Sequence, residues 1–225
     1  MRFIYIDRPD WYLQIYEGRD VIEQSTAESL TRLGQSHNQG ELLDVSGWDI
    51  RKTLKLFRKS NPPLLEWLSS PVIYHRHGEF IDQLRALLSS YYSPRACMHH
   101  YLHMAGGNNR AYLQSERVNL KKYFYVLRPV LACKWIEEGR GAVPMSFGQK
   151  VEELELSSDL RLAIHELLRR KMAGEELDEG PRIGVISDFL EAELARFNAA
   201  GLQNPQESDI EPLNQLFRQT LQQIW

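Results

Sequence analysis

Hydrophobic and polar residues follow two different patterns along this chain, and the change falls near residue 77. Before it, short runs rich in β-branched and aromatic residues alternate with short helical stretches, a pattern typical of an α/β unit. The runs predicted as strands are residues 1 to 7, 21 to 23, 41 to 45 and 71 to 75.

A cationic amphipathic helix is predicted directly after the third of these strands. Ser46 is the predicted N-cap, with Asp49 three residues later at a spacing similar to a capping box. Ile50, Leu54 and Phe57 recur at i, i+4 and i+7, so they share one face of this helix. That face is predicted to pack on the core.

After residue 77 the apolar spacing is helical throughout. The predicted helices cover residues 80 to 91, 94 to 113, 118 to 138, 147 to 154, 159 to 172, 183 to 198 and 211 to 224. The segments between them are polar and marked by glycine or proline. The predicted fold class is therefore α+β, with an α/β domain over residues 1 to 77 and a mainly helical domain over residues 78 to 225.

Composition limits the classes of function and the compartment. The chain has 225 residues, 43% hydrophobic and 25% charged, and a net charge of −3, so any phosphate-binding surface must be a local patch. Cys97 and Cys133 lack a C-x-x-C spacing and are predicted to be buried thiols in a reducing compartment. Neither a membrane span nor a signal peptide is indicated, so we expect a cytoplasmic protein without a membrane partner.

Asp44 is the first candidate for chemistry, because it stands between Leu43 and Val45 in a predicted strand. Carboxylates fixed on a sheet face are hard oxygen ligands of the kind that Mg²⁺ prefers. A carboxylate facing solvent is the alternative, and the pattern alone favours it. Asp49 is the second candidate for a metal ligand, with a role at the helix N-terminus as its alternative.

Two groups of basic residues could bind phosphates. The first is the outer face of the predicted cationic helix, formed by Arg51, Lys52, Lys55, Arg58 and Lys59. Ammonium and guanidinium groups suit phosphate oxygens, but a charge run of this kind is more often a solvated helix face.

The second group is Arg117, Lys121, Tyr125 and Arg128, which recur at i, i+4, i+8 and i+11. The rest of this predicted helix is apolar almost all round, which indicates burial, and buried cations need anionic partners. Those partners are either carboxylates of the protein or the phosphates of a bound triphosphate. The periodicity leaves both open.

Long strings of the chain resemble a known family. The strings are GWDIRKTLKLFRKSNPPLLEWLSSPVIY, HYLHMAGGN and LKKYFYVLRPVLACKWIEEGRGAVPM. They are similar to the bacterial and phage predicted nucleotidyltransferases of the YcgL type, the RNA-repair-pathway branch of the DNA polymerase β superfamily. The resemblance covers most of residues 1 to 150.

The resemblance implies a polymerase-β-like nucleotidyltransferase unit followed by a helical domain, with an NTP and Mg²⁺ as ligands. It implies transfer of a nucleoside monophosphate to a hydroxyl acceptor, an RNA end among the candidates. Asp44 matches the third metal carboxylate of the superfamily. Lys121, Lys122 and Tyr125 resemble helical-domain residues that reach the nucleotide's phosphates.

Two family elements have no counterpart in this chain, the Gly-Ser turn and the Asp-x-Asp strand. In the relatives they come just before the strand that Phe3 to Ile6 continues, so we expect a truncated domain. The chain as written is then expected to lack transferase activity. The alternatives are a non-catalytic nucleotide- or RNA-binding module and a helical interaction protein.

Overall fold

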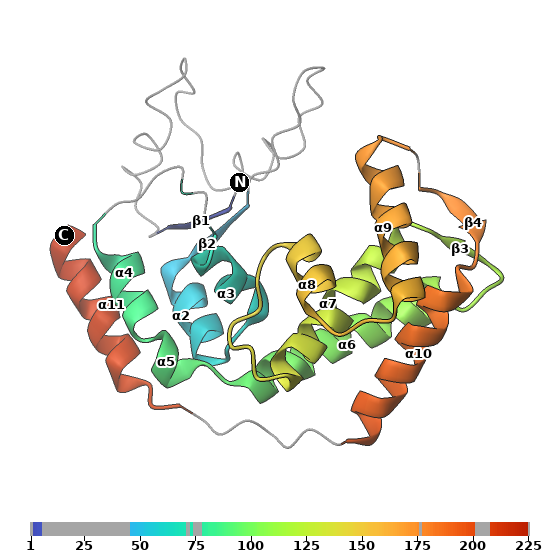
Figure 1. Ribbon diagram of the computed structural model, residues 1–225. Coiled ribbons are helices and arrows are strands. Elements are labelled where there is room, and N and C mark those ends of the chain that lie inside the picture. Colours follow the sequence, from blue (N-terminus) through green and yellow to red (C-terminus); the bar gives the residue numbers. More distant parts are fainter. Residues whose placement is uncertain are drawn as a thin grey trace, which may run out of the picture. The chain divides into compact units, whose positions relative to one another are not determined.

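The computed structural model describes residues 2–5, 46–70, 73, 78–175, 177–200 and 208–224, and the statements below concern these residues (Figure 1). The predicted strand at residues 21 to 23 lies outside them, as does the predicted strand at residues 41 to 45 with Asp44. Of the predicted strand at 71 to 75 only Ile73 is described, and it is not in a strand.

The chain forms two compact units. One contains the described residues of Met1–Leu56 and Ile210–Trp225, and the other is Phe57–Asp209. The predicted domain boundary at residue 77 stays a prediction, because most residues from 71 to 77 lie outside the described part. The fold class is α+β, as predicted.

The first unit contains two short parallel strands. β1, Arg2–Tyr5, pairs with β2, Ser46–Asp49, so that Phe3 lies opposite Gly47 and Tyr5 opposite Asp49. The predicted strand at the start of the chain is therefore confirmed over β1. The same unit contains α11, Glu211–Ile224, whose buried Leu213, Leu216 and Thr220 lie on one face.

The predicted start of the cationic helix was wrong by three residues. Ser46 is not an N-cap, since it belongs to β2, and α2 runs from Ile50 to Arg58. Asp49 takes the capping role instead: its Oδ1 accepts hydrogen bonds from the backbone N–H groups of Arg51 at 2.9 Å and Lys52 at 3.4 Å. Pairing with β1 keeps residues 46 to 49 extended, so the helix begins only where that pairing ends.

The second unit contains most of the helices and a short β-ribbon. Its elements are α3 Pro62–Leu68, α4 Phe80–Ala86, α5 Leu88–Tyr91, α6 Pro94–Tyr112, β3 Arg117–Asn119, α7 Lys122–Glu137, α8 Phe147–Glu153, α9 Ser158–Met172, β4 Glu179–Pro181 and α10 Gly184–Ala199. Polar side chains at four N-caps accept a backbone N–H three residues on, which fixes these starts: Asn61, Ser93, Ser146 and Ser157.

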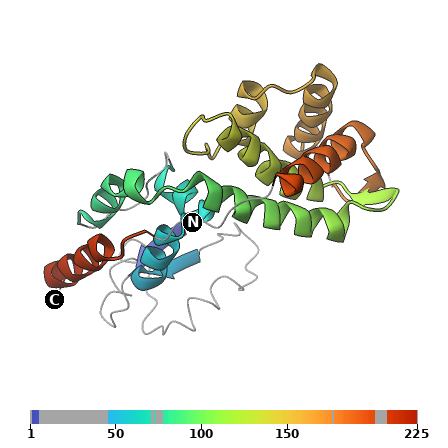
Figure 2. The ribbon, with the colours of Figure 1, turned by 90° about the horizontal axis from the view of Figure 1, so that it is seen from below.

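Helices α6 and α7 lie along each other in the core of this unit (Figure 2). α7 is buried nearly all round, as its apolar sequence predicts, and Pro129 within it is fully packed. α8, α9 and α10 pack around this pair, either on α7 itself or on one another. Cys97 and Cys133 are both buried in this core, and burial raises the pKa of the Cys97 thiol to about 12. Both therefore stay protonated thiols near neutral pH.

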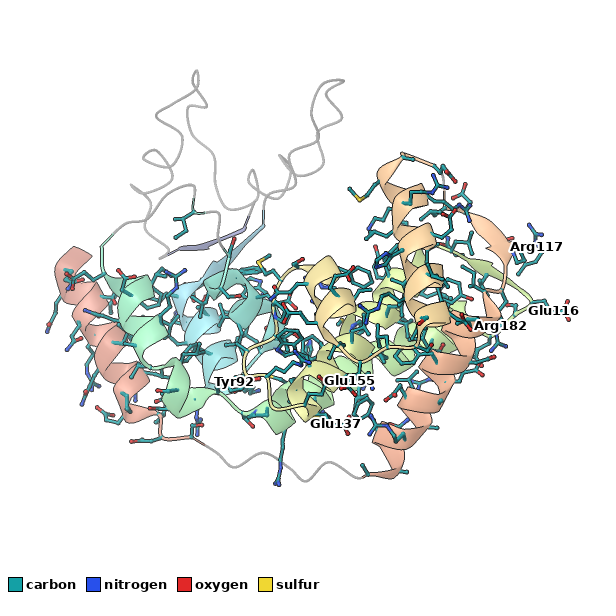
Figure 3. All side chains as sticks on the ribbon, viewed as in Figure 1. Tyr92, Glu116, Arg117, Glu137, Glu155 and Arg182 are labelled. Atoms are coloured by element: carbon teal, nitrogen blue, oxygen red, sulfur yellow. The ribbon has the colours of Figure 1, made fainter. Side chains whose placement is uncertain are left out.

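The helix predicted from residue 118 begins only at Lys122, because the residues before it form a strand. β3 pairs antiparallel with β4, with Val118 opposite Gly180. Beyond the strands the backbone pairing continues, since Leu120 N–H donates to Asp178 O and Arg182 N–H to Glu116 O. Figure 3 shows Glu116, Arg117 and Arg182 together at this ribbon. The partner strand, with the sequence Glu-Gly-Pro, has no strand signal of its own.

The ribbon needs glycine at position 180, because a side chain there would collide with Leu120. A Cβ placed there would lie 2.8 Å from Cδ1 of the buried Leu120. We expect Gly180→Ala to lower the free energy of unfolding by about 1–3 kcal/mol through overpacking. Gly184→Ala is the matched control, since a Cβ there meets no atom within 4 Å. Urea denaturation of both variants checks this, and equal stability of the two variants would contradict it.

No helix in the described ranges is both long enough and apolar enough to cross a bilayer.

Candidate nucleotide-binding site

Two of the predicted ligand residues at the start of α2 are engaged by their own neighbours. The Arg51 Nε donates to Asp49 Oδ1 at 3.1 Å, and the Lys52 Nζ lies 5.1 Å from the ring centroid of Trp48. Asp49, the second metal candidate, thus has one carboxylate oxygen committed to the helix cap and to Arg51. The role at the helix N-terminus accounts for this aspartate.

The described residues do not form a site that fits Mg²⁺. They contain no group of three or more His, Cys, Asp or Glu side chains close enough to share a metal ion. Asp44, the first metal candidate, is outside the described residues. The Mg²⁺ site therefore stays a prediction that depends on Asp44.

The structure separates the members of the second basic group, which was predicted to share one helix face over residues 117 to 128. Arg117 lies on β3, at the ribbon, so it does not share a helix face with the others (Figure 3). Lys121 is the N-cap of α7 and is exposed, and Tyr125, one turn further on, is 47% exposed. The periodicity was right for the residues from Lys121 onward and wrong for Arg117.

Lys122 lies between two tyrosine rings at the beginning of α7. Its Nζ is 4.2 Å from the ring centroid of Tyr112, at the end of α6, and 4.6 Å from that of Tyr125. Both contacts have the geometry of a cation–π interaction. Tyr112 was not among the residues predicted from the sequence, and no local pattern could have found it, because it belongs to another helix.

A third lysine extends this cationic region. The Lys171 Nζ, at the end of α9, lies 4.6 Å from the ring centroid of Phe124, and the Phe124 ring packs on Phe147 of α8. We call this set of cations and rings the lysine–tyrosine face. It consists of Tyr112, Lys121, Lys122, Tyr125 and Lys171.

The charge of this face is unfavourable for the helix that carries it. The N-terminus of a helix has a partial positive charge and is stabilised by acidic residues, yet the first turn of α7 has none and begins with two lysines. Within the described ranges, none of the three lysines of the face has a salt bridge to a carboxylate. Uncompensated cations at a helix N-terminus favour an anionic ligand.

Arg128 forms an ion pair with a carboxylate of the protein. Its guanidinium donates to Glu66 Oε2 at 2.8 Å, while the Tyr101 hydroxyl donates to Glu66 Oε1 at 3.1 Å. The sequence left two kinds of partner open for this arginine, a carboxylate of the protein or the phosphates of a bound triphosphate. The structure shows a carboxylate. The Arg128 side chain is still 44% exposed, so part of its donor set remains accessible.

Lys150, on α8, lies near this ion pair and is fully buried. Its Nζ donates to Pro144 O at 2.7 Å. Burial, with a smaller contribution from the positive charge of Arg128, lowers the pKa of Lys150 to about 8, while Glu66 opposes the shift. Nothing in the sequence pattern indicated a buried lysine here.

Comparison with known proteins places the chain in a family. A model of the RNA repair pathway DNA polymerase beta family matches residues 1–219. The uncharacterized protein YcgL of Bacillus subtilis (strain 168) is 43% identical over 227 aligned positions, which cover 100% of this chain and 82% of that protein. No solved structure matches. The resemblance noted in the sequence is thereby confirmed, and the chain belongs to the RNA repair pathway DNA polymerase beta family.

Proposed function

We propose that the protein binds a nucleoside triphosphate on the lysine–tyrosine face and serves the transfer of a nucleoside monophosphate to a hydroxyl acceptor, with an RNA end as the acceptor class. The observation that carries the proposal is the pair Lys121 and Lys122 at the N-terminus of α7, without a carboxylate partner among the described residues. Membership of a polymerase-beta-like family supports the class of reaction.

In this proposal the ammonium groups of Lys121 and Lys122 bind the phosphates, helped by the positive end of the α7 dipole. Tyr125, one turn along the helix, offers its ring and hydroxyl to the nucleoside. Arg128 contributes the donors that Glu66 leaves accessible, and Glu66 fixes the direction of its guanidinium. Arg51 and Lys52 are secondary candidates, since both are engaged near Asp49 and Trp48.

The metal part of the proposal depends on Asp44, which we assign as one carboxylate ligand of Mg²⁺. Transfer by two metal ions needs further carboxylates. We propose that an Asp-x-Asp element of the kind known in the polymerase β superfamily supplies them.

We expect Lys121→Ala combined with Lys122→Ala to weaken Mg·ATP binding about tenfold or more, because two charge-assisted contacts to phosphate are lost. Isothermal titration calorimetry measures the affinity. Lys55→Ala combined with Lys59→Ala is the comparison, since it removes the same charge from exposed positions elsewhere. A loss confined to this second pair would place the phosphate site on α2 and contradict the proposal.

A non-catalytic nucleotide-binding module is the second candidate function. It is favoured because the described residues contain a cationic face but no cluster of metal-binding carboxylates. A transfer assay with labelled NTP, Mg²⁺ and RNA ends separates the two candidates. Asp44→Asn, which lacks the proposed metal carboxylate, is the control. ATP binding without transfer by the parent protein would leave only the module.

A further inference from the structure

Two tyrosine rings on different helices are exposed beside the same ammonium group. Tyr112 ends α6 and is 43% exposed, and Tyr125 in α7 is 47% exposed. Both rings lie within 5 Å of the Lys122 Nζ, so they are neighbours on the surface of one compact unit. By contrast Tyr101, Tyr91 and Tyr123 of the same unit are buried.

This arrangement exceeds what a single nucleotide needs. A nucleoside triphosphate has one base and can stack on one ring, whereas the face offers two rings and three lysines. Exposed rings interleaved with cations are the features with which proteins bind single-stranded nucleic acid, because each unpaired base can stack on a ring while cations follow the backbone. A duplex hides its base faces and could use only the lysines.

We propose that Tyr112 and Tyr125 form a stacking platform for two unpaired nucleotides of a single-stranded RNA, whose phosphates Lys121, Lys122 and Lys171 contact. The choice of RNA rests on the acceptor class of the proposed function, but the binding itself requires neither NTP nor transfer. Because Lys121, Lys122 and Tyr125 also belong to the proposed NTP site, RNA occupies the platform when no NTP is bound, and the two ligands compete for it. On binding, the Lys122 ammonium exchanges its contact with the rings for a contact with phosphate.

The test is fluorescence anisotropy with a labelled single-stranded RNA and the full chain, without nucleotide or metal. We expect Tyr112→Ala and Tyr125→Ala each to weaken binding about tenfold, since each removes one stacked base. Tyr112→Phe and Tyr125→Phe keep the ring and should bind within about twofold of the parent protein. Leu162→Ala is the control, because Leu162 is 68% exposed and lies on the opposite side of α9 from Lys171.

Several outcomes would overturn the platform. These are absence of RNA binding by the parent protein, equal affinity for a duplex of the same sequence, alanine variants that bind as the parent does, and phenylalanine variants as weak as the alanine ones. RNA binding is measured by anisotropy without nucleotide, and Mg·ATP binding is measured by calorimetry without RNA. Failure of the platform and failure of the proposed nucleotide site are therefore seen in different measurements.

Discussion

Tyr123→Ala is expected to lower the free energy of unfolding of the larger unit by about 3–5 kcal/mol, the range for removal of a large aromatic from a core. Tyr123 is fully buried in the first turn of α7. Its hydroxyl is 2.7 Å from Ser187 Oγ and accepts the backbone N–H of Ile183 at 2.9 Å. The side chain therefore fills the core and also joins α7 to the N-terminus of α10.

Two smaller changes separate these contributions. Tyr123→Phe keeps the ring but leaves the Ile183 N–H and the Ser187 hydroxyl without this partner, at an expected loss of about 1–3 kcal/mol. Ser187→Ala completes a double-mutant cycle, and we expect the two losses to be less than additive because they share a hydrogen bond. Urea denaturation followed by circular dichroism gives the values. If Tyr123→Phe were as damaging as Tyr123→Ala, packing of the ring would not be the main contribution.

Replacement of Lys150 by methionine is expected to change how stability depends on pH. The pKa of Lys150 is about 8 in the folded protein, against the ordinary lysine value of 10.5. Below pH 8 folding must bury a charged amine. Between these two pKa values the unfolded chain binds more protons than the folded one, so the free energy of unfolding of the parent protein rises with pH.

The gain from pH 7 to pH 10 should be about 2–3 kcal/mol, and the methionine variant lacks it. Methionine has a similar volume and no charge to bury, although it cannot donate to Pro144 O. Relative to the parent, we therefore expect the unfolding free energy of the variant to be more favourable at pH 7 than at pH 10. Deprotonation of tyrosines affects both proteins, so the difference between their unfolding free energies isolates Lys150. A difference independent of pH would contradict the shifted pKa.

Most helices of this protein could be predicted from the sequence because their signals are local. Apolar residues at helical spacing gave α6, α8, α9, α10 and α11 to within one or two residues. The side-chain caps at Asn61 and Ser93, which fix the starts of α3 and α6, are likewise local. The helix predicted over residues 80 to 91 is divided into α4 and α5. The two late helix starts, of α2 and α7, arose where a strand pairs with a distant segment, since β2 and β3 depend on partners far away in the chain.

The candidate site was predicted only in part for the same reason. Periodicity grouped Lys121 with Tyr125 on one helix face, and the family resemblance added Lys122. Tyr112 and Lys171 join them from α6 and α9, and no spacing rule relates those positions to α7. Asp44 is still a prediction from the family resemblance.

The sequence by itself determined the helices, the buried face of α7 and the family, because each is encoded in neighbouring residues or in long matching strings. The tertiary structure alone decided which charges meet. It paired Arg128 with Glu66 and left Lys121 and Lys122 without a carboxylate among the described residues. The physical reason is distance: helix signals act over about four residues, whereas ion pairs and ring contacts form between side chains that only folding brings together.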